Sequence, residues 1–109
     1  MLPPLAGQIE RYMTLVSARQ KLTAANIANS DTPDYKTKDI DFQSELNDAL
    51  TGPPHVTEVA GLATKNDGNN VSLDREARML AENAIRFNAA SQLLQGQIRM
   101  IRAAIQDGR

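Results

Sequence analysis

Apolar residues recur without a break along the last third of the chain, at alternating steps of four and three. This stripe, the seam, consists of Leu73, Ala77, Leu80, Ala84, Phe87, Ser91, Leu94, Ile98, Ile101 and Ile105. Ser91 is its one polar position. An apolar repeat of 3.5 residues is typical of helices that pack in a left-handed supercoil. The pattern predicts a helix over residues 72–107, about 50 Å long, whose seam needs a partner helix from this chain, from other chains, or from both.

A second helical pattern begins near the N-terminus and predicts a helix over residues 5–29. One stripe runs from Leu5 to Val16, and a narrower heptad stripe follows through Leu15, Ala18, Leu22, Ala25 and Asn29. Arg11, Arg19 and Lys21 lie off both stripes, so we expect them to face water.

Pro33 ends this helix, because it removes a backbone donor and disfavours helical geometry at Thr32. Thr32 to Tyr35 then has the pattern of a tight turn. An ordinary helix stop would explain this cluster, but Asn26 and Asn29 lie three residues apart, near one face of the helix. Two such amides are more than a helix stop requires.

Residues 30–71 contain few apolar side chains, so we expect an irregular, mobile and acidic loop. Weak alternation from Tyr35 to Phe42 allows a short extended segment, on which Asp39 and Asp41 look exposed. Phe42, Leu46 and Leu50 allow one or two helical turns. Asp67-Gly68 is a candidate turn, and Ser72 or Asp74 can cap the long helix.

The fold class predicted from these patterns is all-α. The chain forms one domain over residues 1–109, in which two long antiparallel helices make a coiled-coil hairpin closed by the middle loop. Aromatic residues make up only 4% of the chain, which suits thin helix-to-helix contacts better than a thick core.

Composition argues against several function classes. The net charge of −1 argues against a general nucleic-acid binder, and no cysteine is present for a thiolate metal site or a disulfide. His55, the only histidine, stands in a breaker segment and is expected to be a loop residue. We therefore expect no enzyme, no cofactor, no metal and no small-molecule substrate.

Neither a membrane-spanning run nor a secretory signal is visible in the sequence. We therefore expect no direct membrane insertion. The chain should stay in the cytoplasm unless a route other than a cleavable signal exports it.

Ala24 to Tyr35, read as A-A-N-I-A-N-S-D-T-P-D-Y, resembles the signature A-N-x-A-N-x-x-T-P-G-Y of the bacterial flagellar rod and hook proteins. Residues 36–42 and 71–76 are most similar to the proximal rod members. Asp34 departs from the signature, which has Gly there, so a type I turn or a left-handed Asp is expected. The middle segment is too short for the extra β-domain of larger family members.

The resemblance implies a structural subunit of the basal-body rod that assembles through its terminal helices and transmits motor torque. It implies copies of itself, other rod and basal-body proteins and the flagellar type III export apparatus as partners, and a periplasmic rod as location. The implied assembly motif comprises Ala25, Asn26, Asn29, Thr32, Pro33 and Tyr35. In addition to the motif residues, we expect Leu15, Leu22 and the seam residues to pack against neighbouring helices.

A cytoplasmic helical adaptor or chaperone that binds a partner helix is the alternative. An adaptor needs the Asn26 to Tyr35 cluster only as a helix stop. Replacing both Asn26 and Asn29 by alanine should then be nearly silent for binding.

Overall fold

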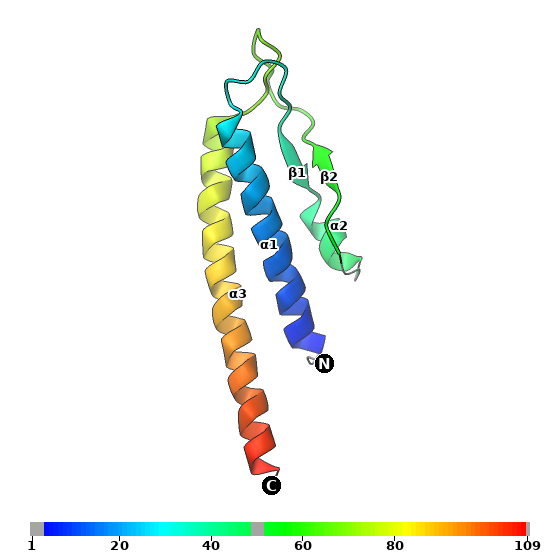
Figure 1. The fold of residues 1–109 in the computed structure, drawn as a ribbon, viewed down its shortest axis with the longest axis vertical. Coiled ribbons are helices and arrows are strands. Elements are labelled where there is room, and N and C mark those ends of the chain that lie inside the picture. The colour runs from blue at the N-terminus through cyan, green and yellow to red at the C-terminus, as the bar shows by residue number, and fades with distance from the viewer. Residues whose placement is uncertain (1–3, 49–51, 109) are drawn as a thin grey trace.

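The computed structural model describes residues 4–48 and 52–108. Its elements, in chain order, are α1 (Pro4–Ala28), β1 (Lys38–Ile40), α2 (Phe42–Asn47), β2 (Val56–Glu58) and α3 (Leu73–Asp107). The molecule is a rod of 68 × 24 × 17 Å in which α1 and α3 lie side by side and the smaller elements flank α1 (Figure 1). Leu50, expected to extend the short helix, falls outside the described residues.

Helices α1 and α3 are antiparallel, which confirms the predicted fold class. The side chain of Asn26, near the end of α1, bonds Glu76, near the start of α3. Further along, Gln20 donates to the carbonyl of Leu80 at 3.4 Å. Ser72 caps α3, accepting a hydrogen bond from the Arg75 N–H, and Gly108 closes it.

The face of α3 that packs against α1 is not the seam. Its buried residues are Glu76, Asn83 and Ala90, spaced seven apart. The buried residues of α1 grade from polar Asn26 and Thr23 to apolar Val16, Leu15, Ile9 and Ala6. The buried surface of α1 is therefore polar at its C-terminal end and apolar towards its N-terminus.

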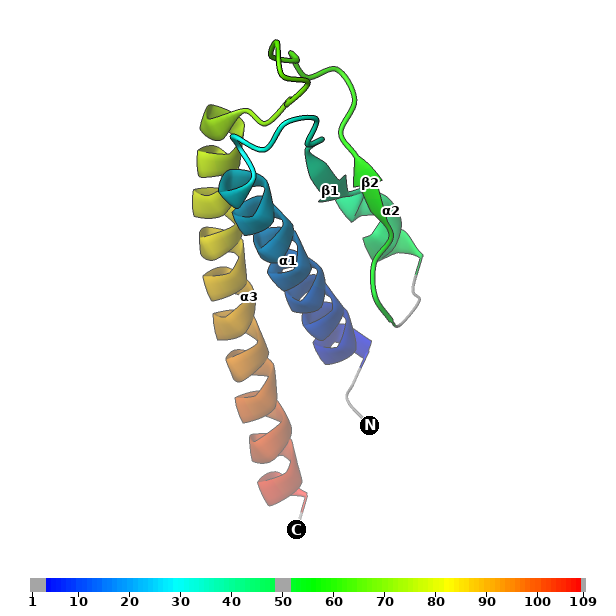
Figure 2. The same cartoon turned by 45° about the horizontal axis from the view of Figure 1, so that its top comes forward.

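The middle segment folds against α1. Strands β1 and β2 pair antiparallel, with Asp39 opposite Thr57, and Asp41 caps α2 by accepting from the Ser44 N–H. Phe42 meets Tyr12 of α1 edge to face, with ring centroids 5.3 Å apart. Figure 2 shows the strand pair and α2 standing beside α1 on the side away from α3. The expected extended segment and short helix are both present, while mobility of this part stays a prediction.

A tight turn at residues 65–69 packs against the turn that follows α1. Lys65 and Asn69 bond through their backbones, and Gly68 has a φ of 85°. Asp34 has a φ of 63°, so of the two expected outcomes, a type I turn or a left-handed Asp, the structure has the left-handed Asp. Its N–H donates to the carbonyl of Asp67 at 2.9 Å, which holds the two turns together.

Gly68→Ala is expected to destabilise the chain by about 1–2 kcal/mol, since the position has a positive φ. A Cβ there would also clash with the Asp34 carboxylate. Gly7→Ala is the matched control, because Gly7 lies inside α1 with no atom near an added Cβ, and it should stabilise by up to about 1 kcal/mol. Urea unfolding measures both, and equal effects would contradict the close approach.

Candidate assembly site

Asn26 forms the centre of the joint between α1 and the segment that follows it. Its side chain is 1% exposed. Its amide nitrogen donates to the Lys38 carbonyl at 2.9 Å, and its amide oxygen accepts from the Lys38 N–H at 3.1 Å. The amide thus pairs with β1 as a neighbouring strand would. It also donates to Glu76 and accepts from the Tyr35 hydroxyl.

The other motif residues close the end of the helix. Asn29 donates to the Ala25 carbonyl at 2.8 Å, and its side-chain oxygen accepts from the Thr32 hydroxyl. The amide of buried Asn69 donates to the carbonyls of Asn29 and Thr32, both at 2.8 Å. Thr32 and Pro33 are themselves exposed at the tip. This geometry exceeds what a helix stop needs, so the ordinary-stop interpretation is insufficient.

A chain of charged side chains continues from this joint across three elements. Glu76, 0% exposed, accepts from both Asn26 and Arg75. Arg75 also donates to Asp39 at 2.8 Å, and Arg19 of α1 grips the same carboxylate with two hydrogen bonds of 2.9 Å. Two arginines on different helices therefore converge on one aspartate of β1.

Three expectations about charged residues, those for Asp39, Arg19 and Arg11, were wrong. Asp39 is buried rather than exposed, and Arg19 is partly buried and paired rather than facing water. Arg11 is also paired, with Glu45 at 3.4 Å, whereas Lys21 is exposed as expected. Hydrophobic periodicity cannot detect such cations, because a long side chain off the apolar stripe can still fold back to a buried acid.

Burial on its own raises the pKa of Asp39, but hydrogen bonds from Arg19, from the Ile40 N–H and from Arg75 together outweigh it. The pKa of Asp39 therefore lies below its ordinary value. The pKa of Glu45 is also lowered, chiefly because the backbone N–H and the ring of His55 bond it.

Asp39→Asn is expected to destabilise the chain by about 2 kcal/mol at pH 7, since two arginines lose their carboxylate. Because the pKa is lower in the folded chain than in the unfolded one, this contribution is present above the ordinary Asp pKa of about 3.9. It disappears as the pH falls through the folded-state value. Urea unfolding between pH 7 and pH 2 should show wild type and variant converging at acid pH. Glu58→Gln, on the exposed strand β2, should leave the profile unchanged.

The seam lies largely outside the contact between α1 and α3. Its exposed members are Leu73, Ala77, Leu80, Ala84, Phe87 and Ile105, while Ser91, Leu94, Ile98 and Ile101 are half-buried. On α1, Leu15 is buried and Leu22 half-buried, but Ala25 is exposed. The sequence left the partner of the seam open, and within the described chain α1 covers it only in part.

The site contains no arrangement typical of catalysis. Among the described residues, no group of three or more His, Asp or Glu side chains could hold a metal ion. Over the same residues, no helix is both long and apolar enough to span a bilayer. The joint orders the backbone, and much of the seam is an apolar surface exposed to solvent.

The chain is similar to known flagellar proteins. A family described as "Flagella basal body rod protein" matches residues 13–36, the second half of α1 and the joint. The flagellar basal body rod protein FlgB of Escherichia coli K12 is 31% identical, with 91% of each chain covered. FlgB of Bacillus subtilis 168 is 30% identical over 93% of this chain and 92% of its own.

The chain belongs to the FlgB family of flagellar basal-body rod proteins. The resemblance stated from residues 24–42 and 71–76 is thereby confirmed. The family match ends at Lys36, so it includes Asn26, Asn29 and Tyr35 of the joint. It does not reach Asp39 and Arg75, which the structure brings to the same place.

Pattern reasoning missed the buried charges of the joint. Glu76, Asn83 and Ala90 are spaced seven apart, but an acid, an amide and an alanine do not form an apolar pattern. The neighbouring seam is far more apolar, so hydropathy does not indicate the face towards α1. No sequence signal distinguishes Asp39 from Asp41 as the buried carboxylate.

Proposed function

We propose that this chain is a structural subunit of the proximal part of the flagellar rod, which assembles with copies of itself and with other rod proteins. The observation that carries the proposal is the open apolar seam of α3 on a chain of the FlgB family. An apolar face on a solvated helix marks a surface for another protein. The relatives named above are rod proteins, and they supply the kind of assembly in which such a surface is covered.

The joint supports a mechanical role for this subunit. Buried hydrogen bonds and ion pairs hold α1, β1 and α3 together at one end of the rod-shaped molecule. Such connected polar networks favour one arrangement of the elements they join. The angle between α1 and α3 would then stay fixed when torque passes from one subunit to the next.

Location, export and the chemical role complete the proposal. The rod would lie in the periplasm, and the chain would reach it through the flagellar type III export apparatus without a cleavable signal. It would act as a structural protein and not as an enzyme. We also propose that Thr32 and Pro33, exposed at the tip, form part of a subunit contact.

The cytoplasmic adaptor, which was the alternative from the sequence, is not favoured, because the chain belongs to a family of rod proteins. The double replacement of Asn26 and Asn29 does not separate the two functions, since Asn26 holds the fold itself together and cannot be silent. The discriminating property is instead where the chain resides and how many copies assemble.

Fractionation of cells with electron microscopy of purified basal bodies tests the proposal. We expect the chain to copurify with basal bodies and cells lacking it to build no rod. Recovery of the chain only in the soluble fraction, bound to one partner, would favour the adaptor.

A further inference from the structure

An apolar groove of about 1100 Å³ lies between α1, α2 and α3. Its lining includes Tyr12, Leu46, Ile85, Ala89 and Leu93. Ile85 is 70% exposed and Leu93 55% exposed, so large apolar side chains stand open to water there. The groove has the form of a seat for an amphipathic helix.

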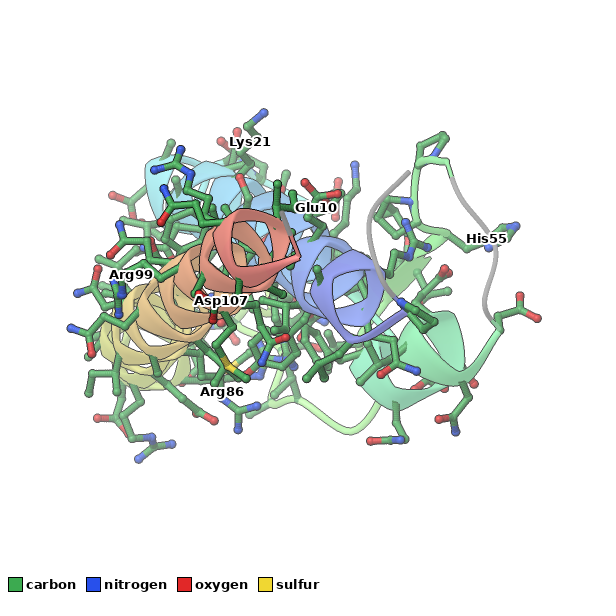
Figure 3. The ribbon with its side chains drawn as sticks, turned by 90° about the horizontal axis from the view of Figure 1, so that it is seen from below. Glu10, Lys21, His55, Arg86, Arg99 and Asp107 are labelled. Carbon is green, nitrogen blue, oxygen red and sulfur yellow. The ribbon has the colours of Figure 1, made fainter. Side chains whose placement is uncertain are left out.

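The groove and the middle of the seam lie on opposite sides of the α1 contact. At about 100° per residue, Phe87 and Leu93 fall about 60° to either side of buried Ala90. Arg86, which lines the groove, points to the side of the molecule opposite Glu10 and Lys21 (Figure 3). The groove and the seam are therefore two separate apolar surfaces.

The cations of the groove already have partners. Arg11 pairs with Glu45 and Arg86 with Glu82. When the apolar side of a helix enters the groove, both arginines keep their carboxylate partners, so the groove does not require an anionic ligand.

Among the residues that the structure describes, the C-terminal end of α3 extends beyond the helix beside it. The register set by Gln20 with Leu80 places Pro4, the first residue of α1, level with about residue 97 of α3. Residues 98–107, the overhang, continue past α1 (Figure 1). The overhang bears the last three seam residues, Ile98, Ile101 and Ile105, of which Ile105 is 64% exposed.

We propose that the groove receives the overhang of a second copy of this chain. The overhang continues the seam beyond the first residue of α1, so its apolar side chains need a helix that α1 does not supply. Groove and overhang also match in length. The groove spans residues 85–93 of α3, about 13 Å, and the overhang about 15 Å. The inference rests on the proposed function for its choice of a like copy.

The two copies lie parallel, displaced along the rod axis by about 18 Å, the length of the twelve residues that separate Ala89 from Ile101. Because the groove and the overhang are different surfaces, each copy can give one and receive one. Such a heterologous contact repeats without closing. An antiparallel arrangement would instead let two copies exchange overhangs and stop at a dimer.

Cysteine cross-linking tests this contact, because the chain has no cysteine of its own. The test variant is Ala89→Cys with Ile101→Cys, expressed in place of the wild type and oxidised mildly in assembled basal bodies. Its two sulfurs cannot pair within one chain, since about 18 Å of helix separates them. Lys21→Cys with Ile101→Cys is the control, since Lys21 is exposed on the opposite side.

A ladder of oligomers from the test variant, with the control staying monomeric, is the expected result. Absence of the ladder from basal bodies that contain the variant, dimers alone, or equal cross-linking in the control would overturn the docking and leave the rod function intact. If Ile101→Cys prevents incorporation, exposed Arg102→Cys replaces it with the same expected ladder. A wild-type chain absent from basal bodies would instead reject the proposed function, and the docking with it.

Discussion

Asn26→Ala is expected to lower the free energy of unfolding by about 3 kcal/mol. The substitution leaves the backbone N–H and carbonyl of Lys38 and the carboxylate of fully buried Glu76 each short of a hydrogen bond. Buried groups without partners cost about 1–3 kcal/mol each, and part of this cost is relieved by water at the exposed Lys38. Thermal unfolding followed by circular dichroism should show a melting temperature lower by more than about 10 °C.

Asn88→Ala is the matched control for Asn26→Ala. Asn88 is an exposed residue of α3, so its loss should change stability by no more than about 0.5 kcal/mol. Asn29→Ala should fall between the two, because its amide bonds only nearby groups at the helix end. If Asn26→Ala melts like the control, the joint does not hold the fold together.

Phe87→Asp is expected to abolish rod assembly while leaving the single chain folded. Phe87 is 38% exposed in the single chain, so a carboxylate there can remain hydrated before assembly. Once a neighbouring helix covers the seam, the same carboxylate is buried without a partner, which costs several kcal/mol at every contact. Swimming in soft agar and rod counts in electron micrographs should both fall to the level of a strain without the protein.

Gln92→Glu adds the same charge five residues further along the exposed surface of α3 and serves as the control. It should assemble, because at about 100° per residue it lies about 140° around the helix from Phe87. The melting temperature of purified Phe87→Asp should stay close to wild type. A motile strain carrying Phe87→Asp, or equal failure of both variants, would remove the seam from the assembly contact.

The long helices were predictable because their patterns are strong. The seam, Pro33, Ser72 and Gly108 together predict helices close to Pro4–Ala28 and Leu73–Asp107. At Asp34 the motif allowed a type I turn or a left-handed residue, and the structure has the left-handed one. These features are local, and local propensity and spacing determine them.

The rotation of α3 about its axis was not predictable from hydropathy. The most apolar stripe would ordinarily be assigned to the contact within the chain. Here Glu76 finds Asn26 and Arg75, so a charged side chain can be fully buried against α1. Asn26 and Glu76 are 50 positions apart in the sequence, and a periodic pattern within one helix cannot indicate such a contact. The same holds for Arg19 with Asp39.

Because α3 buries a partly polar stripe and leaves much of its apolar surface exposed, unfolding of a single molecule exposes little additional apolar surface to water. The heat-capacity change of unfolding increases with that apolar area. Calorimetry of the single chain should therefore give a small heat-capacity change of unfolding for its size. Association of subunits should give a strongly negative heat-capacity change, because it buries the remaining apolar surface.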